Sequence, residues 1–403
     1  MKVLQINCVN KFGSTGRLVT QVGNFLDEKG AENRIAHGIP DVGDKKAFVI
    51  NSKFDAHFHS FMSRKLCMQG LCSSFATKKL VKYINKYDPD IIHLHNLHGH
   101  YLNYNILFRY LKNSRAKVMW TLHDCWAVTG KCSHFTKAAC FKWEQDEGCN
   151  NCPQLHTYPD STFDRSAKNF ALKKKLFTAV ENLTVVTVSE WLKGICERSY
   201  LKEKRIVHIH NGIDTKIFRP VQSDVLKQLG IENKNVVLGV SNIWNGQKGE
   251  EQFIELSKRL PEGYVVVLVG KNSENVAKNS EKIVAVAQTK NQEELVKLYS
   301  AASVFVSTSI EDSCPLVVLE ALACGTPTVV YNSTGLTENV PEKCGRVIDI
   351  NDTEALVLSV IDIAENQEKY RQHCTFFVND NYTVEIMCES YYKLYKELTG
   401  EKQ

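Results

Sequence analysis

The most informative segment of the chain is Ser307 to Val330, which reads S-T-S-I-E-D-S-C-P-L-V-V-L-E-A-L-A-C-G-T-P-T-V-V. An apolar run predicts a strand over 302–306, and Pro315 predicts the start of a helix. The carboxylates of Glu311 and Asp312 follow the strand, and Glu320 falls inside the helix. N–H groups in the first turn of a helix attract anions. The stretch therefore predicts a phosphate-binding helix start with acids beside it, which suits a nucleotide sugar.

The composition bounds the class of protein. A chain of 403 residues exceeds what one hydrophobic core usually serves, so two domains are expected. Hydrophobic content of 43% and charged content of 24% are typical of a globular protein. The net charge of +5 is mild and spread over short lysine clusters, which argues against nucleic acid as a partner.

The N-terminal ten residues lack the apolar core of a signal peptide, and no run approaches the roughly 18 apolar residues of a membrane span. Fourteen cysteines without a secretion signal indicate mostly reduced thiols. We therefore expect a cytoplasmic protein.

Strand and helix patterns alternate through the first half of the chain. Apolar runs at 3–9, 91–95 and 117–122 predict strands, with helices predicted over 17–29, 76–87 and 101–112. This alternation indicates a parallel sheet covered on both faces, where ligands bind beyond the carboxyl ends of the strands.

A glycine-rich loop follows the first predicted strand. Gly13 and Gly16 would let the backbone approach a ligand, while Ser14 and Arg17 can donate hydrogen bonds. The loop matches neither G-x-G-x-x-G nor a P-loop, so a tight turn before a packed helix is an equal alternative.

Polar clusters follow the next two predicted strands. His95, Asn96 and His98 come after one strand, and His123 comes after the other. A lone histidine is more often a structural residue, but imidazoles at successive strand ends favour a ligand-binding cleft.

Four cysteines interrupt the alternation at Cys132, Cys140, Cys149 and Cys152, and the last pair has C-x-x-C spacing. Four thiolates can complete a tetrahedral structural zinc site. Free or redox thiols and disulfides are the alternatives, and Cys125 and His134 are candidate substitute ligands.

The second half repeats the strand and helix alternation, with a Lys248-Gly249 loop after its first predicted strand. A turn at 210–214 and a break at 218–220 suggest the linker. The predicted domains are 1–215 with a cysteine-rich loop at 125–156, then 216–380, and a C-terminal helix over 381–403 that packs back toward the first domain.

Together these motifs resemble glycosyltransferase family 4, the retaining enzymes of GT-B fold that act on nucleotide sugars. The resemblance rests on the glycine loop, on T-L-H-D-C-W at 121–126, H-N-G-I-D at 210–214, Lys248-Gly249, and the stretch from Glu311 to Val330. It implies an α/β architecture with two Rossmann-like domains whose parallel sheets face each other across a central cleft.

The resemblance also implies roles for individual residues. Lys248 would hold the donor diphosphate, Glu320 the nucleotide ribose, and Glu311 or Asp312 the donor sugar, with His123 facing the transferred sugar. Gly13 to Arg17 would close on the phosphates, Leu316 and Val317 lie at the helix start, and His95, Asn96 and His98 would lie on the acceptor side.

This sequence departs from the family pattern in two places. The usual pair of glutamates separated by seven residues is Asp312 with Glu320 here, and Glu311 lies one residue earlier. The arginine usually found about five residues before the lysine is absent from 242–247. The sequence leaves open which acid meets the sugar, and Lys248 is the one certain cation.

The T-G-x-C and G-C-x-x-C-P segments resemble a subset that builds bacterial surface polysaccharides such as capsule. This implies a UDP- or GDP-sugar donor, a saccharide or lipid-linked acceptor, and peripheral contact with the inner face of the membrane. Arg64, Lys65, Lys78 and Lys79 are the candidate basic cluster for that contact, and an ordinary solvated face is an equal alternative. No cofactor is expected for catalysis. The alternatives are a nucleotide-sugar 2-epimerase and a non-enzymatic, zinc-held interaction module.

Overall fold

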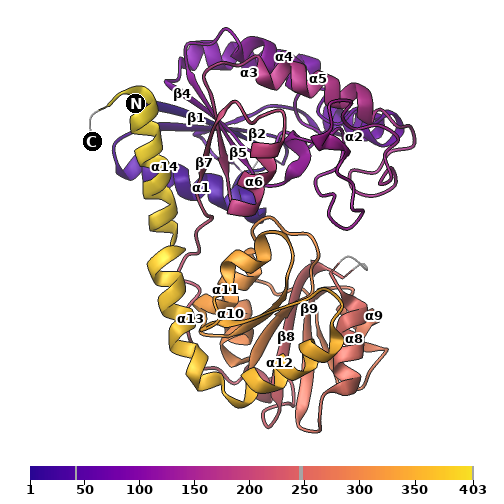
Figure 1. Cartoon of the computed structure of the whole chain (residues 1–403). Helices are drawn as coiled ribbons and strands as arrows, with labels where there is room; N and C mark the ends of the chain where they lie inside the picture. The colour runs from indigo at the N-terminus through magenta and orange to yellow at the C-terminus, as the bar shows by residue number, and fades with distance from the viewer. Residues whose placement is uncertain (41–42, 245–247, 402–403) are drawn as a thin grey trace. The chain divides into compact units, whose positions relative to one another are not determined.

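The computed structural model describes residues 1–40, 43–244 and 248–401, which form two compact units (Figure 1). The first unit comprises Met1–His210 together with the chain from Met387 onward, and the second comprises Asn211–Ile386. The sequence placed these boundaries at 215/216 and 380/381. Phe218, expected in a linker, is 3% exposed and belongs to the core of the second unit.

The first unit is built on a seven-stranded sheet in the order β3-β2-β1-β4-β5-β6-β7, with every neighbouring pair parallel. Its strands are β1 (Lys2–Asn7), β2 (Glu32–His37), β3 (Ala47–Val49), β4 (Ile91–Leu94), β5 (Lys117–Leu122), β6 (Leu183–Thr187) and β7 (Arg205–His208).

Helices cover both faces of this sheet. The helices of this unit are α1 (Gly13–Glu28), α2 (Lys53–Leu66), α3 (Ser74–Tyr87), α4 (Tyr104–Leu111), α5 (Ser166–Thr178), α6 (Glu190–Arg198), the C-terminal part of α14 (Val384–Thr399), and the 3-10 turns η1 (Cys125–Ala127) and η2 (Lys142–Glu144).

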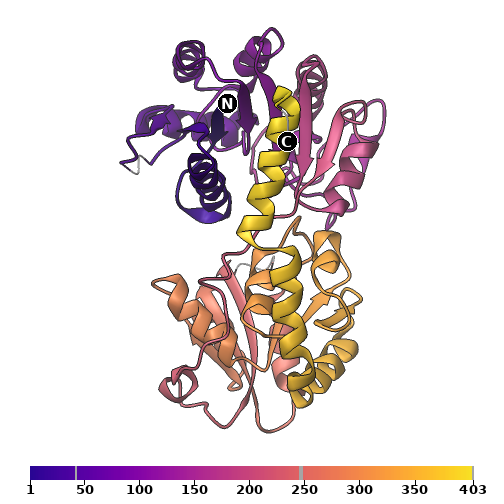
Figure 2. The same ribbon diagram turned by 90° about the vertical axis from the view of Figure 1, so that its left-hand side faces the viewer.

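Successive side chains of β5 show how the two faces are filled. The Trp120 ring packs against Phe108 of α4 and Phe177 of α5, whereas the hydroxyl of Thr121 lies 3.1 Å from that of Tyr391 in α14. Because side chains alternate along a strand, α4 and α5 cover one face and α14 the other. Figure 2 shows α14 in yellow lying across this sheet.

The second unit has a six-stranded sheet in the order β10-β9-β8-β11-β12-β13, also entirely parallel. Its strands are β8 (Asn235–Ile243), β9 (Tyr264–Lys271), β10 (Ile283–Val286), β11 (Val304–Ser307), β12 (Thr328–Tyr331) and β13 (Gly345–Ile348).

In Figure 1, α8, α9 and α12 cover one face of the second sheet, and α10, α11 and α13 cover the other. The helices are α7 (Val225–Gln228), α8 (Glu250–Arg259), α9 (Ser273–Ala277), α10 (Gln292–Ala301), α11 (Leu316–Ala323), the 3-10 helix η3 (Thr334–Asn339), α12 (Thr353–Glu365) and α13 (Gln367–Asn381).

These two sheets confirm the predicted α/β class with two Rossmann-like domains. In each, the strand order reverses beside the first strand, between β1 and β4 and between β8 and β11. Ligands of such sheets bind beyond the carboxyl ends of the strands at this reversal. A ligand site is therefore expected in the loops that follow β1, β4, β8 and β11.

One smaller expectation changes, and some helices were not predicted. Pro315 is the residue that precedes the first turn of α11, rather than part of it, and none of the described side chains caps this helix. The sequence also gave no prediction for α2, α5 or α13. No helix in the described ranges is both long and apolar enough to span a bilayer.

Candidate functional site

The second unit gathers a cation, hydroxyl groups and acids around the start of α11. The ammonium of Lys248 lies 3.7 Å from a carboxylate oxygen of Asp312 and 3.5 Å from the hydroxyl of Ser309. The side chains of Lys248 and Asp312 are 40% and 28% exposed, so both remain accessible to a ligand. The structure thus brings together two residues that are far apart in the sequence and that we expected to share a site.

Backbone geometry fixes this cluster. Gly249 has φ of 78°, and a Cβ there would lie 2.0 Å from the hydroxyl oxygen of Thr308. That hydroxyl donates to the carbonyl of Lys248 at 3.1 Å. Only glycine allows the two loops to approach this closely, which is why the lysine is followed by glycine.

The two acids of the loop are held differently. The backbone N–H of Asp312 donates to the Thr334 hydroxyl at 3.1 Å, and that hydroxyl donates to the carbonyl of Asp312 at 2.8 Å. Asp312 is thereby fixed beside Lys248. Glu311 is partly buried, and its carbonyl accepts from the hydroxyl of Ser309.

Glu320 lies inside α11 and is only 5% exposed. The hydroxyl of Tyr299, from α10, donates to its Oε2 at 3.1 Å. A buried carboxylate needs such donors to remain charged. Leu316 and Val317 are half-buried in the first turn of the same helix.

In the first unit, one small cavity is lined by all four histidine and asparagine positions that we expected there. His95, Asn96 and His98 reach it from the end of β4, and His123 reaches it from the end of β5. The indole of Trp120 donates to the carbonyl of His95 at 2.9 Å, which ties the end of β4 to the neighbouring strand.

Two of these histidines form a neutral pair. Nδ1 of His95 lies 3.3 Å from Nε2 of His123, so one ring donates and the other accepts. Burial lowers the pKa of His123 to about 4 and the pKa of His95 well below its ordinary value. Near neutral pH both imidazoles can donate or accept a hydrogen bond without carrying charge.

Asp124 is a site residue that we did not predict. Its Oδ2 lies 2.8 Å from Nε2 of His98, and its Oδ1 accepts from the N–H of Trp126. Burial would raise the pKa of Asp124, but His98 outweighs this and the pKa falls to about 2. The H-D pair at 123–124 was the available signal, since both residues follow the same strand.

The glycine loop lies at the carboxyl end of β1, next to β4. Gly13 begins α1 with φ of 66° and has open space around it, and no side chain of the described ranges caps the helix. A Cβ on Gly16 would lie 3.2 Å from Val9, so this glycine serves packing. Ser14 is exposed and Arg17 is half-buried. The tight packing before a helix is therefore seen at Gly16, and the approach of a ligand to Gly13 stays a prediction.

Comparison with known proteins assigns the chain to a family. Residues 15–217, half of the chain, match Glycosyltransferase Family 4, and residues 221–375 match Glycosyl transferases group 1. The chain belongs to glycosyltransferase family 4. The sequence-based resemblance is confirmed, and the protein is a transferase of GT-B type.

Among its relatives is WcaC, the glycosyl transferase assigned to colanic acid biosynthesis in Escherichia coli (strain K12), which is 28% identical over 69% of this chain and 68% of its own. Another is the UDP-Gal:alpha-D-GlcNAc-diphosphoundecaprenol alpha-1,3-galactosyltransferase of Escherichia coli, which is 26% identical over 52% of this chain and 58% of its own. The solved structure of Anabaena HepE with UDP-glucose has a TM-score of 0.67 at 14% identity, covering 98% of this chain and 100% of that one.

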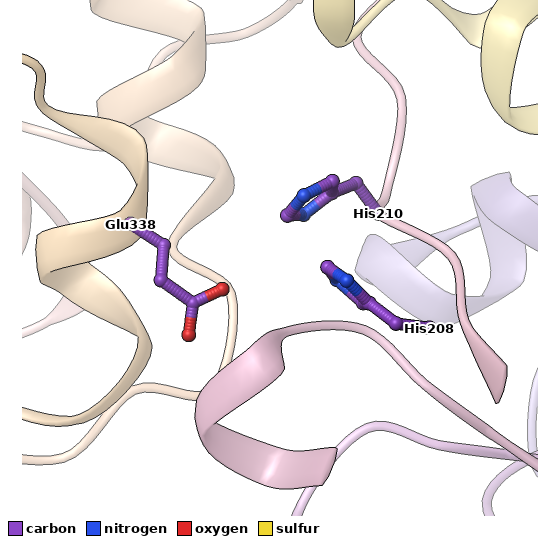
Figure 3. A group of neighbouring side chains, drawn as sticks. All are labelled: His208, His210 and Glu338. Atoms are coloured by element: carbon purple, nitrogen blue, oxygen red, sulfur yellow. The ribbon is translucent and has the colours of Figure 1, made fainter. Parts of the chain in front are cut away.

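The H-N-G-I-D segment of this glycosyltransferase follows β7. The rings of His208 and His210 meet edge to face with centroids 4.0 Å apart (Figure 3), and Nδ1 of His208 lies 2.8 Å from a carboxylate oxygen of Glu190. Burial lowers the pKa of His210 to about 4. In the second unit a Cβ on Gly212 would lie 2.6 Å from the carbonyl oxygen of Thr383, so glycine is required there too.

The expected arginine position before Lys248 is only partly described. Asn242, Ile243 and Trp244 belong to the described residues, and residues 245–247 lie outside them. The indole of Trp244 donates to the carbonyl of Val269 at 3.1 Å, and its ring is buried in the core of the second unit.

Proposed function

We propose that this glycosyltransferase transfers a sugar, with retention of configuration, from a UDP- or GDP-sugar to a saccharide acceptor that is linked to a lipid. Its place would be surface polysaccharide biosynthesis at the inner face of the membrane. The observation that carries the proposal is the ammonium of Lys248, held beside Asp312 and Ser309 near the start of α11. Such a cluster fits a diphosphate next to a sugar.

In the proposed reaction the bond between the sugar and the diphosphate breaks, the acceptor oxygen bonds to the same face of the sugar, and the acceptor hydroxyl passes its proton to the departing diphosphate. Negative charge then grows on the departing diphosphate. Lys248 and the N–H groups at the start of α11 would stabilise this charge. His123 would lie against the transferred sugar, and His95, Asn96 and His98 would bind the acceptor. The Gly13 to Arg17 loop would complete the donor site.

Relatives support this choice of substrates. The Escherichia coli galactosyltransferase is named for a UDP-galactose donor and a diphosphoundecaprenol-linked acceptor, and HepE was solved with UDP-glucose. We therefore favour a uridine donor and a lipid-linked acceptor for this chain.

The test is release of nucleoside diphosphate from UDP- and GDP-sugars in the presence of lipid-linked saccharides. Lys248→Ala should lower kcat/KM by about 10²-fold or more, since removing one group that stabilises transition-state charge costs about that much. Glu320→Ala should weaken donor binding. Lys234→Ala, an exposed lysine of the same unit, is the matched control. Unchanged turnover in both folded site variants would reject the assignment. Donor consumption without any acceptor would instead favour an epimerase.

A surface of the first unit favours contact with a membrane. On α2, Phe54, Phe58 and Phe61 are 82%, 51% and 57% exposed, and their spacing puts them on one side of the helix. Phe75 at the start of α3 is 72% exposed. Nδ1 of His59 in α2 lies 2.8 Å from the hydroxyl of Ser73, which precedes α3.

Basic residues accompany these aromatic side chains. Lys53, Arg64 and Lys65 of α2 are exposed, as are Lys78 and Lys79 of α3, and the ammonium of Lys79 lies over the ring of Phe75. Apolar rings that enter the headgroup region, together with cations that face anionic lipid, are typical of peripheral membrane helices. We propose an anionic lipid surface as the partner of α2 and the start of α3.

Sedimentation with phosphatidylglycerol vesicles tests this contact. Wild-type protein should bind and should prefer these vesicles to phosphatidylcholine vesicles. The double variant F54S/F58S should lose most of this binding, whereas F376S, which removes a 60% exposed phenylalanine from the second unit, should not. Equal binding by both variants, or a surface that drives self-association without vesicle binding, would overturn the proposal.

A further inference from the structure

A cysteine cluster in the first unit plays no part in the proposed transfer chemistry. Cys132, Cys140, Cys149 and Cys152 all line one cavity, and Cys125 and His134 are not among its lining residues. No disulfide is formed among the described cysteines. Between η1 and α5 the chain has one 3-10 turn, η2, as its regular structure. A segment with so few regular backbone hydrogen bonds needs other interactions to hold its conformation.

We propose that these four cysteines bind one zinc ion as a structural site. Each thiol would give up its proton to solvent, and the four thiolates would surround the metal tetrahedrally. Since all four positions are filled by protein, no open position remains for catalysis. The site would stabilise the segment that carries these cysteines.

The surroundings fit the charge of such a centre. A zinc ion with four thiolates carries a net charge of −2, and Lys131 and Lys142 line the same cavity. The Lys131 ammonium donates to the carbonyls of Gln154 and Thr157, and that of Lys142 donates to the carbonyls of Asn150 and Asn151. The backbone N–H of Gly130 donates to the sulfur of Cys149 at 3.2 Å. Cations and N–H donors of this kind stabilise thiolate ligands.

The thiols surround the cavity without meeting at one point. Among the described residues, the side-chain groups whose ligand atoms all lie within 4.8 Å of one another do not include these cysteines. In a tetrahedral centre with zinc–sulfur bonds of about 2.3 Å, the sulfur atoms lie about 3.8 Å apart. A change of rotamer moves a cysteine sulfur by about 3 Å, so metal binding requires side-chain rotation.

The proposed zinc site would also order the wall of the acceptor cavity. The N–H of Cys125 donates at 2.9 Å to the carbonyl of Ser133, one residue after the first of the four cysteines. Farther along the segment, the hydroxyl of Tyr158 lies 3.4 Å from Nδ1 of His98, which lines that cavity. A fixed conformation of the segment would therefore help to position His98, a residue of the proposed acceptor site.

The experiment is metal analysis of the full chain, supplied with zinc under reducing conditions and then dialysed against metal-free buffer. We expect about one zinc per chain by mass spectrometry. Replacement by Co²⁺ should give the visible absorption of a tetrahedral cobalt–thiolate centre. Removal of the metal by a strong chelator should lower the unfolding temperature by roughly 5 °C or more.

Cys149→Ser and Cys152→Ser should each lose most of the bound metal. Cys72→Ser, which alters a 7% exposed cysteine of the same unit outside the cavity, should retain it. If the ligand variants do not fold, the cobalt spectrum of the wild-type chain still decides the question. A wild-type chain that retains no zinc and gives no cobalt–thiolate absorption, or a disulfide within the four in the reduced preparation, would overturn the proposal.

Discussion

Gly249 is a single position on which the placement of Lys248 beside Asp312 depends. Its positive φ and its contact with Thr308 bring the Lys248 loop against the loop that carries Asp312. A larger residue would have to separate the two loops. The distance between the Lys248 ammonium and the Asp312 carboxylate would then increase.

Gly249→Ala should therefore lower the free energy of unfolding of the second unit by about 3 kcal/mol and weaken binding of UDP-sugar. About 1 kcal/mol of this is backbone strain at positive φ, and the remainder comes from displacing Thr308. Gly230→Ala is the matched control, because Gly230 has φ of 70° with nothing within 4 Å. Chemical denaturation and calorimetric titration measure both effects. Equal losses in the two variants would contradict the role of the Thr308 contact.

The sequence predicted which residues of the second unit lie together better than it predicted their hydrogen-bond partners. Lys248 and Asp312 were predictable because each follows a predicted strand and strand ends meet at one edge of a parallel sheet. The bond between His98 and Asp124 was not, because it depends on how the loops after β4 and β5 turn. The hydrogen bond from the Tyr299 hydroxyl to Glu320 likewise depends on the packing of α10 against α11.

The helix α14 is joined to the first sheet by buried polar groups. The Tyr395 hydroxyl lies 2.6 Å from Nδ1 of His93, whose Nε2 lies 2.8 Å from the hydroxyl of Thr121. The centroid of the His93 ring in turn lies 3.9 Å from the centroid of the His95 ring. The helix therefore helps to position His95, which lines the cavity at the ends of β4 and β5.

Tyr395→Phe should cost about 1–3 kcal/mol of the unfolding free energy of the first unit, because it leaves a buried nitrogen of His93 without its partner. Tyr392→Phe, which preserves the ring contact with Phe25, should cost much less. Denaturant titrations of both variants measure the difference. A loss of the same size in Tyr392→Phe would point to general helix packing instead of the His93 bond.

Buried histidines should make the first unit sensitive to acid. The pKa of His59 is lowered to about 3 and that of His123 to about 4, both by burial. The unfolded chain binds these protons below a pH of about 6.5 and the folded chain does not, so stability is full above that pH and falls as pH decreases. Between about pH 6 and pH 4, each such histidine lowers the free energy of unfolding by at most about 1.4 kcal/mol for each pH unit of acidification.

Unfolding free energies measured from pH 7.5 to pH 5 give this slope. His59→Gln should reduce it, because glutamine can accept from the Gly70 N–H without titrating. His156→Gln removes a histidine whose side chain is 79% exposed and should leave the slope unchanged. An unaltered slope in His59→Gln would contradict the assignment.

Helices were harder to predict than strands for identifiable reasons. The strands β4 and β5 stand out because burial on both faces makes them nearly continuous apolar runs. The apolar pattern of α5 is interrupted, because its buried face includes a lysine. Lys173 is 1% exposed and donates to the carbonyls of Trp126 and Thr129. In α2 the apolar pattern does not mark the buried face, because phenylalanines lie on the exposed side of the helix.

The two units share one topology. Both sheets have parallel strands that reverse order beside the first strand, and each unit carries its polar residues at that edge. The proposed transfer requires groups from both units to act on one donor. Binding of the donor should therefore alter the first unit as well as the second.

Hydrogen exchange of the full chain measures this coupling. UDP-sugar should protect the amides around Lys248 and the start of α11, and it should also protect the loop from Gly13 to Arg17 in the first unit. Lys248→Ala should abolish both changes, because it removes the diphosphate contact. Arg17→Ala should diminish protection of the first-unit loop while most nucleotide binding persists. Saturating UDP-sugar that protects the second unit and leaves the glycine loop unchanged would show that the first unit does not close on the phosphates.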